Sequence, residues 1–242
     1  LPVIGFKPDV VHCHDWQTGL IPVYLKDRFR GGEFFTNMKS VMTIHNLKFQ
    51  GVWDVKTIQR FSMLPDYYFT PDKLEAYKDG NMLKGGIVFA DAITTVSQTY
   101  AEEIKMPFYG EGLDGLMRAR SGDLRGIVNG IDYDEFNPET DKLIAQPYNA
   151  KNFRKEKGKN KKQLQAQLGL PVDEKKFMVG IVSRLTDQKG LDLVQCVMDE
   201  LCSDDMQFVV LGTGDEKYEN MFRHYDWKYH DRVSAQIYYS ND

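Results

Sequence analysis

Short apolar segments that end in polar clusters and lead into helical patterns recur along most of this chain. Segments of this length and order are typical of parallel strands that alternate with covering helices. The pattern therefore predicts an α/β fold. One expected strand ends near residue 12, and the others span residues 39–44, 92–96, 177–182 and 207–211. The expected helices span residues 17–29, 81–90 and 152–168, the last of them amphipathic. Ser97 is expected to cap a further helix that carries Glu102 and Glu103 in its early turns.

Two groups of turn-forming residues interrupt the alternation near the middle of the chain. Residues 129–132 read Asn-Gly-Ile-Asp and residues 137–140 read Asn-Pro-Glu-Thr, and both favour turns. Strand and helix patterns resume after them. We therefore expect two domains, residues 1–126 and residues 127–242.

The composition excludes several classes of protein. Of the 242 residues, 42% are hydrophobic, which is enough for a sizeable core. The net charge of -4 argues against a general nucleic-acid-binding protein, and no apolar run is long enough for a membrane span. The three cysteines form no Cys-x-x-Cys pair, so we expect reduced thiols and a cytoplasmic protein. The sequence leaves the oligomeric state open.

One basic segment stands apart from this acidic background. Residues 151–162 contain seven lysines and arginines against one glutamate. We expect the exposed side of a helix there, with contact to a polyanion or a glucan surface as the alternative.

Polar residues gather where the predicted strands end. Ligands of parallel sheets bind at the carboxyl ends of the strands, so loops at these positions predict a binding cleft. The residues concerned are His12, His14, Asp15, Trp16, His45, Asn46, Asn129, Arg184, Lys189, Gly212 and Gly214.

Arg184 and Lys189 indicate an anionic ligand. They follow a predicted strand and precede a helix, whose free N–H groups also attract anions. Arg184 offers a planar fork to phosphate oxygens and Lys189 a point charge, so a diphosphate fits this pair. A solvated pair of loop cations is the alternative. Gly212 and Gly214 give room for a close ligand, but two glycines are too few for a dinucleotide-binding motif.

The residues after the first two strands each have two interpretations. Asp15 either caps the helix expected near residue 17 or contacts a sugar. His45 is either a structural histidine or a donor to a sugar hydroxyl or carbonyl group. We expect His12 and His14 to point to opposite faces of their strand and therefore not to share a metal ion.

Aromatic residues follow the second predicted strand. Such rings can stack on sugar faces, but we expect most of these to pack in the core. They are Trp53, Phe61, Tyr67, Tyr68 and Phe69.

Seven short motifs together resemble one enzyme family, bacterial glycogen synthase and plant starch synthase. They occur in the order typical of that family and span nearly the whole chain. They are residues 12–17 (HCHDWQ), 43–51 (TIHNLKFQG), 90–97 (ADAITTVS), 109–116 (YGEGLDGL), 126–132 (GIVNGID), 182–192 (VSRLTDQKGLD) and 211–215 (LGTGD).

The resemblance implies a GT-B fold, in which two Rossmann-like domains face each other across a cleft. Residues 1–126 would belong to the acceptor-side domain and residues 127–242 to the nucleotide-sugar-binding domain. The implied activity is retaining transfer of glucose from ADP-glucose to the non-reducing end of an α-1,4-glucan such as glycogen, without a metal or other cofactor.

The resemblance also implies roles for individual residues. Arg184 and Lys189 would neutralise the leaving diphosphate, His45 would contact the donor glucose, and Asp15 would help to position a sugar. Asn129 would lie by the cleft, and the loop with Gly212 and Gly214 would lie against the nucleotide.

The chain lacks two motifs of the family, an N-terminal Lys-x-Gly-Gly loop and a C-terminal glutamate motif. It resembles a central fragment with both domains truncated, so we expect the 242 residues alone to be nearly inactive. Two alternatives stay open. One is another GT-B glucosyltransferase that uses UDP-glucose, and the other is a non-catalytic module that binds glucan or nucleotide.

Overall fold

The computed structural model describes residues 1–29, 31–203 and 205–240. The chain divides into two compact units, Leu1–Gly130 and Ile131–Asp242. The division lies a few residues after position 126, where the turn-forming residues indicate a boundary. Each unit is described by itself.

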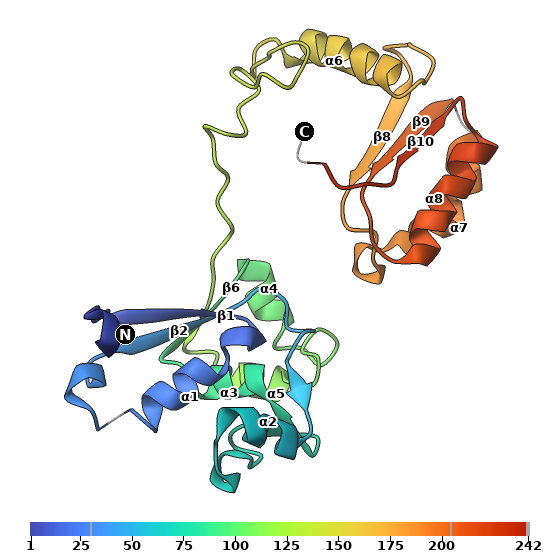
Figure 1. Cartoon of the computed structure of the whole chain (residues 1–242). Helices are drawn as coiled ribbons and strands as arrows, with labels where there is room; N and C mark the ends of the chain where they lie inside the picture. The colour runs from blue at the N-terminus through green and yellow to red at the C-terminus, as the bar shows by residue number, and fades with distance from the viewer. Residues whose placement is uncertain (30, 204, 241–242) are drawn as a thin grey trace. The chain divides into compact units, whose positions relative to one another are not determined.

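The first unit contains a four-stranded sheet in the order β1-β2-β6-β7, and all neighbouring strands are parallel (Figure 1). A small antiparallel sheet, in the order β3-β5-β4, lies between β2 and β6 in the sequence. The strands are β1 (Val10–His14), β2 (Lys39–Ile44), β3 (Val52–Trp53), β4 (Glu75–Ala76), β5 (Asp79–Asn81), β6 (Ala92–Thr95) and β7 (Leu124–Gly126). The helices are α1 (Leu20–Lys26), α2 (Val55–Ser62), α3 (Met82–Phe89), α4 (Gln98–Glu103) and α5 (Asp114–Ala119).

Alternating side chains of the parallel strands form the core of this unit. Cys13, Met42 and Ile93 are fully buried and pack with Leu83 and Ile87 of α3. Each buried methionine, leucine or isoleucine side chain among them contributes roughly 1.5–3 kcal/mol. The sheet therefore gains its stability on the face that α3 covers.

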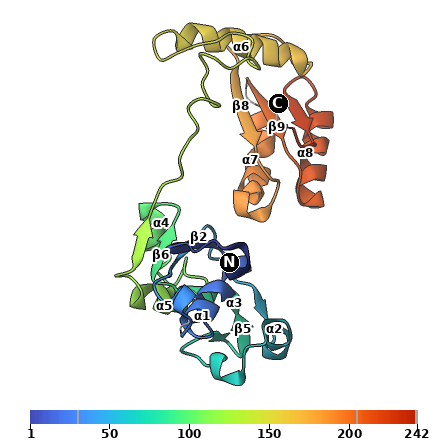
Figure 2. The same cartoon turned by 60° about the vertical axis from the view of Figure 1, so that its left-hand side comes forward.

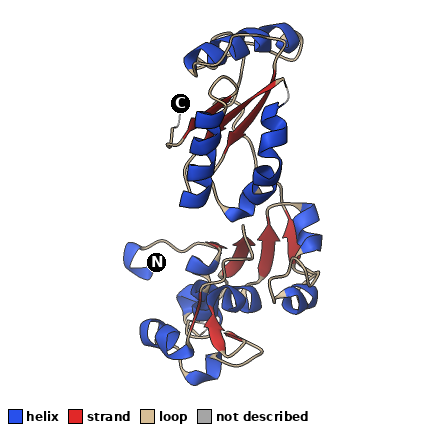
Figure 3. Ribbon diagram, turned by 90° about the vertical axis from the view of Figure 1, so that its right-hand side faces the viewer, coloured by secondary structure: helices blue, strands red, loops and turns tan. Residues whose placement is uncertain are grey.

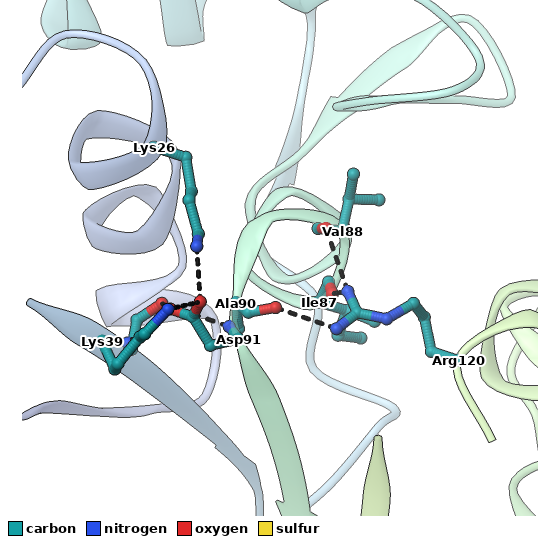
Figure 4. Close-up of polar contacts among 8 residues, drawn as sticks. Lys26, Lys39, Ile87, Val88, Ala90, Asp91 and Arg120 are labelled. Atoms are coloured by element: carbon teal, nitrogen blue, oxygen red, sulfur yellow. Dashed lines mark hydrogen bonds and ion pairs between the residues drawn. The ribbon is translucent and has the colours of Figure 1, made fainter. Parts of the chain in front are cut away.

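Two polar anchors fix α3 and the start of β6 (Figure 4). The Asp91 carboxylate accepts the backbone N–H of Ser40 at 2.8 Å and pairs with Lys26 and Lys39. The Arg120 guanidinium donates to three carbonyl oxygens at the end of α3, those of Ile87, Val88 and Ala90. The helix thus ends with satisfied carbonyl groups, and β6 is held beside β2.

The helices of the first unit differ in part from the expected ones. Residues 17–29 do not form one helix: a 3₁₀ turn (Trp16–Thr18) precedes α1, which ends at Lys26. Pro22 lacks an N–H and fits only in the first turn, so the α-helix begins close to it. Ser97 caps α4 as expected, since its side chain accepts the N–H of Tyr100. The helix has only six residues, so Glu102 and Glu103 lie at its end and not in early turns.

The second unit contains a parallel three-stranded sheet in the order β10-β9-β8. Helices α7 and α8 cover one face, and Figures 2 and 3 show both on the same side of the strands. The core between them includes Phe208, Val210, Met198 and Phe222. The elements are α6 (Phe153–Gln167), β8 (Phe177–Val182), α7 (Leu191–Ser203), β9 (Met206–Leu211), α8 (Glu216–Lys228) and β10 (Val233–Gln236).

Helix α6 spans nearly the expected residues but does not have the expected amphipathic character. Its buried residues are polar, namely Glu156 and Gln165. The Gln165 amide donates to the side chain of Gln207 on β9 and exchanges hydrogen bonds with the backbone of Asp173. A buried amide with these partners attaches α6 to the sheet by hydrogen bonds and not by an apolar stripe.

The loops after β8 and β9 touch through their backbones. The N–H of Leu185 donates to Thr213 O at 2.9 Å, and the N–H of Asp215 donates to Leu185 O at 2.7 Å. A Cβ atom on Gly212 would overlap Ser183 O, and one on Gly214 would overlap Leu185 O. Glycine is therefore required at both positions by this contact alone.

None of the helices in the described residues is long and apolar enough to cross a membrane. Cys13, Cys196 and Cys202 are free thiols. Burial raises the pKa of the Cys13 thiol to about 11.

We expect Asp91→Asn to destabilise the first unit by about 1.5–3 kcal/mol at neutral pH, because its charge-assisted hydrogen bonds are weakened. Burial alone would raise the pKa of Asp91, but its bonds to Lys26 and Ser40 outweigh burial and lower it. The stabilisation is therefore present above about pH 4 and is lost as the pH falls through the lowered pKa. Urea unfolding at several pH values measures it. The exposed Asp27→Asn should change little, and equal effects of the two variants would contradict this role for Asp91.

We expect Gly214→Ala to destabilise the second unit by about 1–3 kcal/mol or more, because the added methyl overlaps the backbone of Leu185. Gly180→Ala is the matched control, since a Cβ there meets no atom within 4 Å. Urea unfolding followed by circular dichroism compares the two. A tolerated Gly214→Ala would show that the two loops separate at little cost.

Candidate active site

In the first unit, Asp15 joins the carboxyl ends of β1 and β2. Its N–H donates to Thr43 O at 3.0 Å, and its carboxylate Oδ1 accepts the N–H of His45 at 2.8 Å and that of Asn46 at 3.5 Å. The side chain makes no capping hydrogen bond to the turn that follows it. The helix-cap interpretation of Asp15 is therefore wrong, and its carboxylate instead holds the start of the loop after β2.

The backbone of Asp15 is in a rare conformation. Its φ of 51° and ψ of -169° lie in a region that residues other than glycine seldom adopt. Such a conformation costs of the order of 1–3 kcal/mol and is typical of functional sites. The hydrogen bonds to Thr43 and His45 offset this cost.

The loop that begins at His45 is held at two further points. The Tyr100 hydroxyl accepts the N–H of Leu47 at 3.1 Å, and the Gln50 amide donates to the carbonyls of Leu47 and Glu111. Burial raises the pKa of Tyr100, so its hydroxyl keeps its proton. Residues 45–51 are thus fixed by groups from three parts of the first unit. Gln50 lies within the motif of residues 43–51, whereas no sequence pattern identifies Tyr100 as part of the site.

His12 and His14 lie on the same face of β1, so the expectation of opposite faces is wrong. Their ring centroids are 4.2 Å apart, because residues two apart in a strand share a face. His14 Nδ1 lies 3.0 Å from His45 Nε2, and His12 Nε2 lies 2.6 Å from Thr43 Oγ1. Burial and the neighbouring His14 and His45 lower the pKa of His12. Among the described residues no group of three or more histidine, cysteine or carboxylate side chains is placed to hold a metal ion.

In the second unit, Arg184 and Lys189 lie in the loop between β8 and α7. Both are exposed, and neither is part of an ion pair among residues 131–203 and 205–240. Asp187, between them, accepts hydrogen bonds from Lys217 and Tyr218 of α8 at 2.6 Å each. The loop is therefore tied to α8 through Asp187, while the two cations keep their charge available.

Arg184 borders a cavity of about 200 Å³ at the carboxyl ends of β8 and β9. Gly212 and Thr213 form another wall, and Tyr238 and Tyr239 line it from the segment after β10. The structure thus brings together Arg184 and the glycine loop, as the sequence predicts. The two tyrosines are additional lining residues, and no sequence pattern identifies them, because no strand is predicted at the residues of β10.

Asn129 is exposed in an irregular segment after β7, close to the division between the units.

The sequence also contains an Asp-x-Asp pair, Asp132 and Asp134. Asp132 Oδ1 accepts the N–H groups of Asp134 and Glu135, which lowers the pKa of Asp132. Its carboxylate therefore closes a turn.

Most of the aromatic residues that follow β2 do not enter the core, so that expectation is wrong. Tyr68 is buried, but Trp53, Phe61 and Tyr67 are 41%, 56% and 62% exposed. Trp53 packs edge-on against Trp16 beside the loop after β2.

The basic segment 151–162 does lie on a helix, and its lysines are mostly exposed.

Known proteins resemble this chain closely. Residues 1–119 match the family model described as the starch synthase catalytic domain. A glycogen synthase from Lachnospira eligens is 73% identical over all 242 residues, which are 51% of that protein. One from Clostridium acetobutylicum is 52% identical over 98% of this chain and 49% of its own length. The chain spans about half the length of the curated relatives it matches.

A solved structure is also similar. The catalytic domain of starch synthase IV from Arabidopsis thaliana, bound to ADP and acarbose, matches with a TM-score of 0.90 and 31% identity. The match covers 100% of this chain and 50% of that one. Together with the two parallel sheets and their polar loops, these likenesses show that the chain has a GT-B type α/β fold and belongs to the glycogen synthase and starch synthase family.

Proposed function

We propose that the protein to which this chain belongs is a glycogen synthase. It transfers glucose from ADP-glucose to the non-reducing end of an α-1,4-glucan, with retention of configuration. In the reaction, the bond between the anomeric carbon and the diphosphate breaks and its electron pair leaves with the diphosphate. The acceptor oxygen forms the glycosidic bond and its hydroxyl proton is released. The names of the relatives and the ADP and acarbose of the similar structure support this substrate pair.

The observation that carries the proposal is the cavity beside Arg184. Two strand ends, a glycine loop and two tyrosines converge there. A diphosphate at this position would meet the Arg184 guanidinium and the backbone of Gly212, while tyrosine rings offer a face for a base. This combination favours a nucleotide over a neutral ligand.

Arg184 and Lys189 would act on the leaving group. Negative charge accumulates on the diphosphate as the bond to glucose breaks, and fixed cations stabilise that charge in the transition state. Neither Arg184 nor Lys189 is part of an ion pair in the described part of the second unit, while Asp187 accepts hydrogen bonds from Lys217 and Tyr218. Arginine and lysine would thereby take the electrostatic part that a metal ion plays elsewhere.

The residues of the first unit would act on sugars. His45 would contact the donor glucose, and Asp15 would hold the His45 loop in place and thereby position the sugar. Asn129 would contribute near the junction of the two domains. The loop with Gly212 and Gly214 would lie against the nucleotide. The three free cysteines support a cytoplasmic location.

We expect Arg184→Ala and Lys189→Ala each to lower the rate of glucose transfer by about 10²–10³-fold, the scale for loss of one group that stabilises transition-state charge. The measurement is incorporation of labelled glucose into glycogen from ADP-glucose, by a protein of the relatives' length that contains this chain.

Two variants serve as controls. Lys175→Ala removes an exposed lysine elsewhere in the second unit and should leave the rate unchanged. Arg184→Lys keeps the charge but loses the planar fork, so its rate should be intermediate. Transfer from UDP-glucose alone would favour a different glucosyltransferase, and glycogen binding without any transfer would favour a non-catalytic module.

A further inference from the structure

The rings of His14 and His45 form a direct contact. His14 Nδ1 and His45 Nε2 are 3.0 Å apart, a hydrogen-bond distance, and the two rings are inclined by only 30°. A neutral imidazole carries one N–H and one bare nitrogen. For two facing ring nitrogens to bond, one must donate and the other must accept. The tautomer of His14 therefore decides which nitrogen of His45 carries the proton.

The pair is fixed from both sides. On the β1 side, the His12 ring lies 4.2 Å from the His14 ring, and His12 is hydrogen-bonded to Thr43. Thr43 Oγ1 in turn lies 2.6 Å from Thr94 Oγ1 on β6. A row of hydrogen-bonded side chains thus runs across β1, β2 and β6 beside the imidazoles. These contacts restrict the position of the His14 ring.

On the β2 side, His45 is held by its backbone. Its N–H donates to the Asp15 carboxylate at 2.8 Å, so the start of the side chain is fixed. One ring nitrogen, Nε2, is engaged by His14. Nδ1 is then the nitrogen of His45 that remains for a ligand.

We propose that His14 is a positioning residue that orients the His45 imidazole and fixes its tautomer, so that Nδ1 of His45 faces the donor sugar. The inference rests on the proposed function for the identity of the sugar, and on the geometry of the pair for the rest. His14 acts through His45 and does not itself touch the substrate.

The pair can be tested in the 242-residue chain without any assay of activity. In ¹⁵N-histidine-labelled protein, we expect a scalar coupling across the hydrogen bond between His14 Nδ1 and His45 Nε2. With five histidines in the chain, single substitutions assign the signals. In His14→Ala the coupling should vanish, and the His45 nitrogens should shift to values of exchanging tautomers.

Two variants separate this role from simple packing. His14→Asn places an amide group near the position of Nδ1, so it should restore the His45 tautomer seen in the unaltered chain. His230→Ala, on the second unit, should leave the His45 signals unchanged. Absence of the coupling in the unaltered chain, or identical His45 spectra with and without the His14 ring, would overturn the proposal.

A kinetic measurement tests the consequence for catalysis. In a protein of the relatives' length, His14→Ala should lower kcat by about 10²-fold, as for misplacement of a contacting group, and His14→Asn should recover most of it. A normal kcat in His14→Ala would overturn the positioning role even if the coupling is seen. Absence of glucose transfer by the unaltered protein would instead count against the proposed function. It would not affect the spectroscopic evidence for the hydrogen bond between His14 and His45.

Discussion

Loops that leave the same edge of a parallel sheet must pack against one another, and the sites of both units depend on this constraint. In the first unit the contact is made by a side chain: Asp15 at the end of β1 binds the backbone at the end of β2. In the second unit it is made by the backbone: the segment at Gly214 lies directly against Leu185. A carboxylate and a missing Cβ thus solve the same problem in two ways.

These two solutions have different consequences for chemistry. The hydrogen bonds of Asp15 offset the strain of its backbone, and they fix His45 next to His14. The glycine contact needs no side chain, so the loop after β9 stays narrow and leaves a cavity beside Arg184. The first unit therefore presents oriented hydrogen-bonding groups, which suit a sugar. The second presents charge and backbone, which suit a diphosphate.

Much of the fold follows from the sequence because apolar runs and caps are local signals. Strands β2 and β8 have the expected bounds, and Ser97 caps α4. What local patterns do not give is the partner of a polar side chain. Gln165 lies in a helix whose spacing indicates an apolar stripe, yet it is buried through its bond to Gln207.

The residues of the candidate site also divide into those that local sequence patterns identify and those whose role depends on partners distant in the sequence. Arg184 and the glycines are found from their position after strands, since their setting is local. Asp15 is found as well, but its partner His45 lies thirty positions away in the chain, so the cap interpretation cannot be rejected from the sequence. The face of His14 could have been predicted, because residues two apart in a strand share a face. Tyr238 comes to the cavity only through the pairing of β10 with β9.

The proposed function requires that the carboxyl ends of β8 and β9 bind a nucleoside diphosphate through Arg184. A titration of ¹⁵N-labelled chain with ADP, followed by amide chemical shifts, tests it most directly. We expect shifts concentrated in residues 183–189 and 212–214, with much weaker binding in Arg184→Ala. Shifts confined to other regions, or equal affinity for ADP with and without the Arg184 side chain, would contradict it.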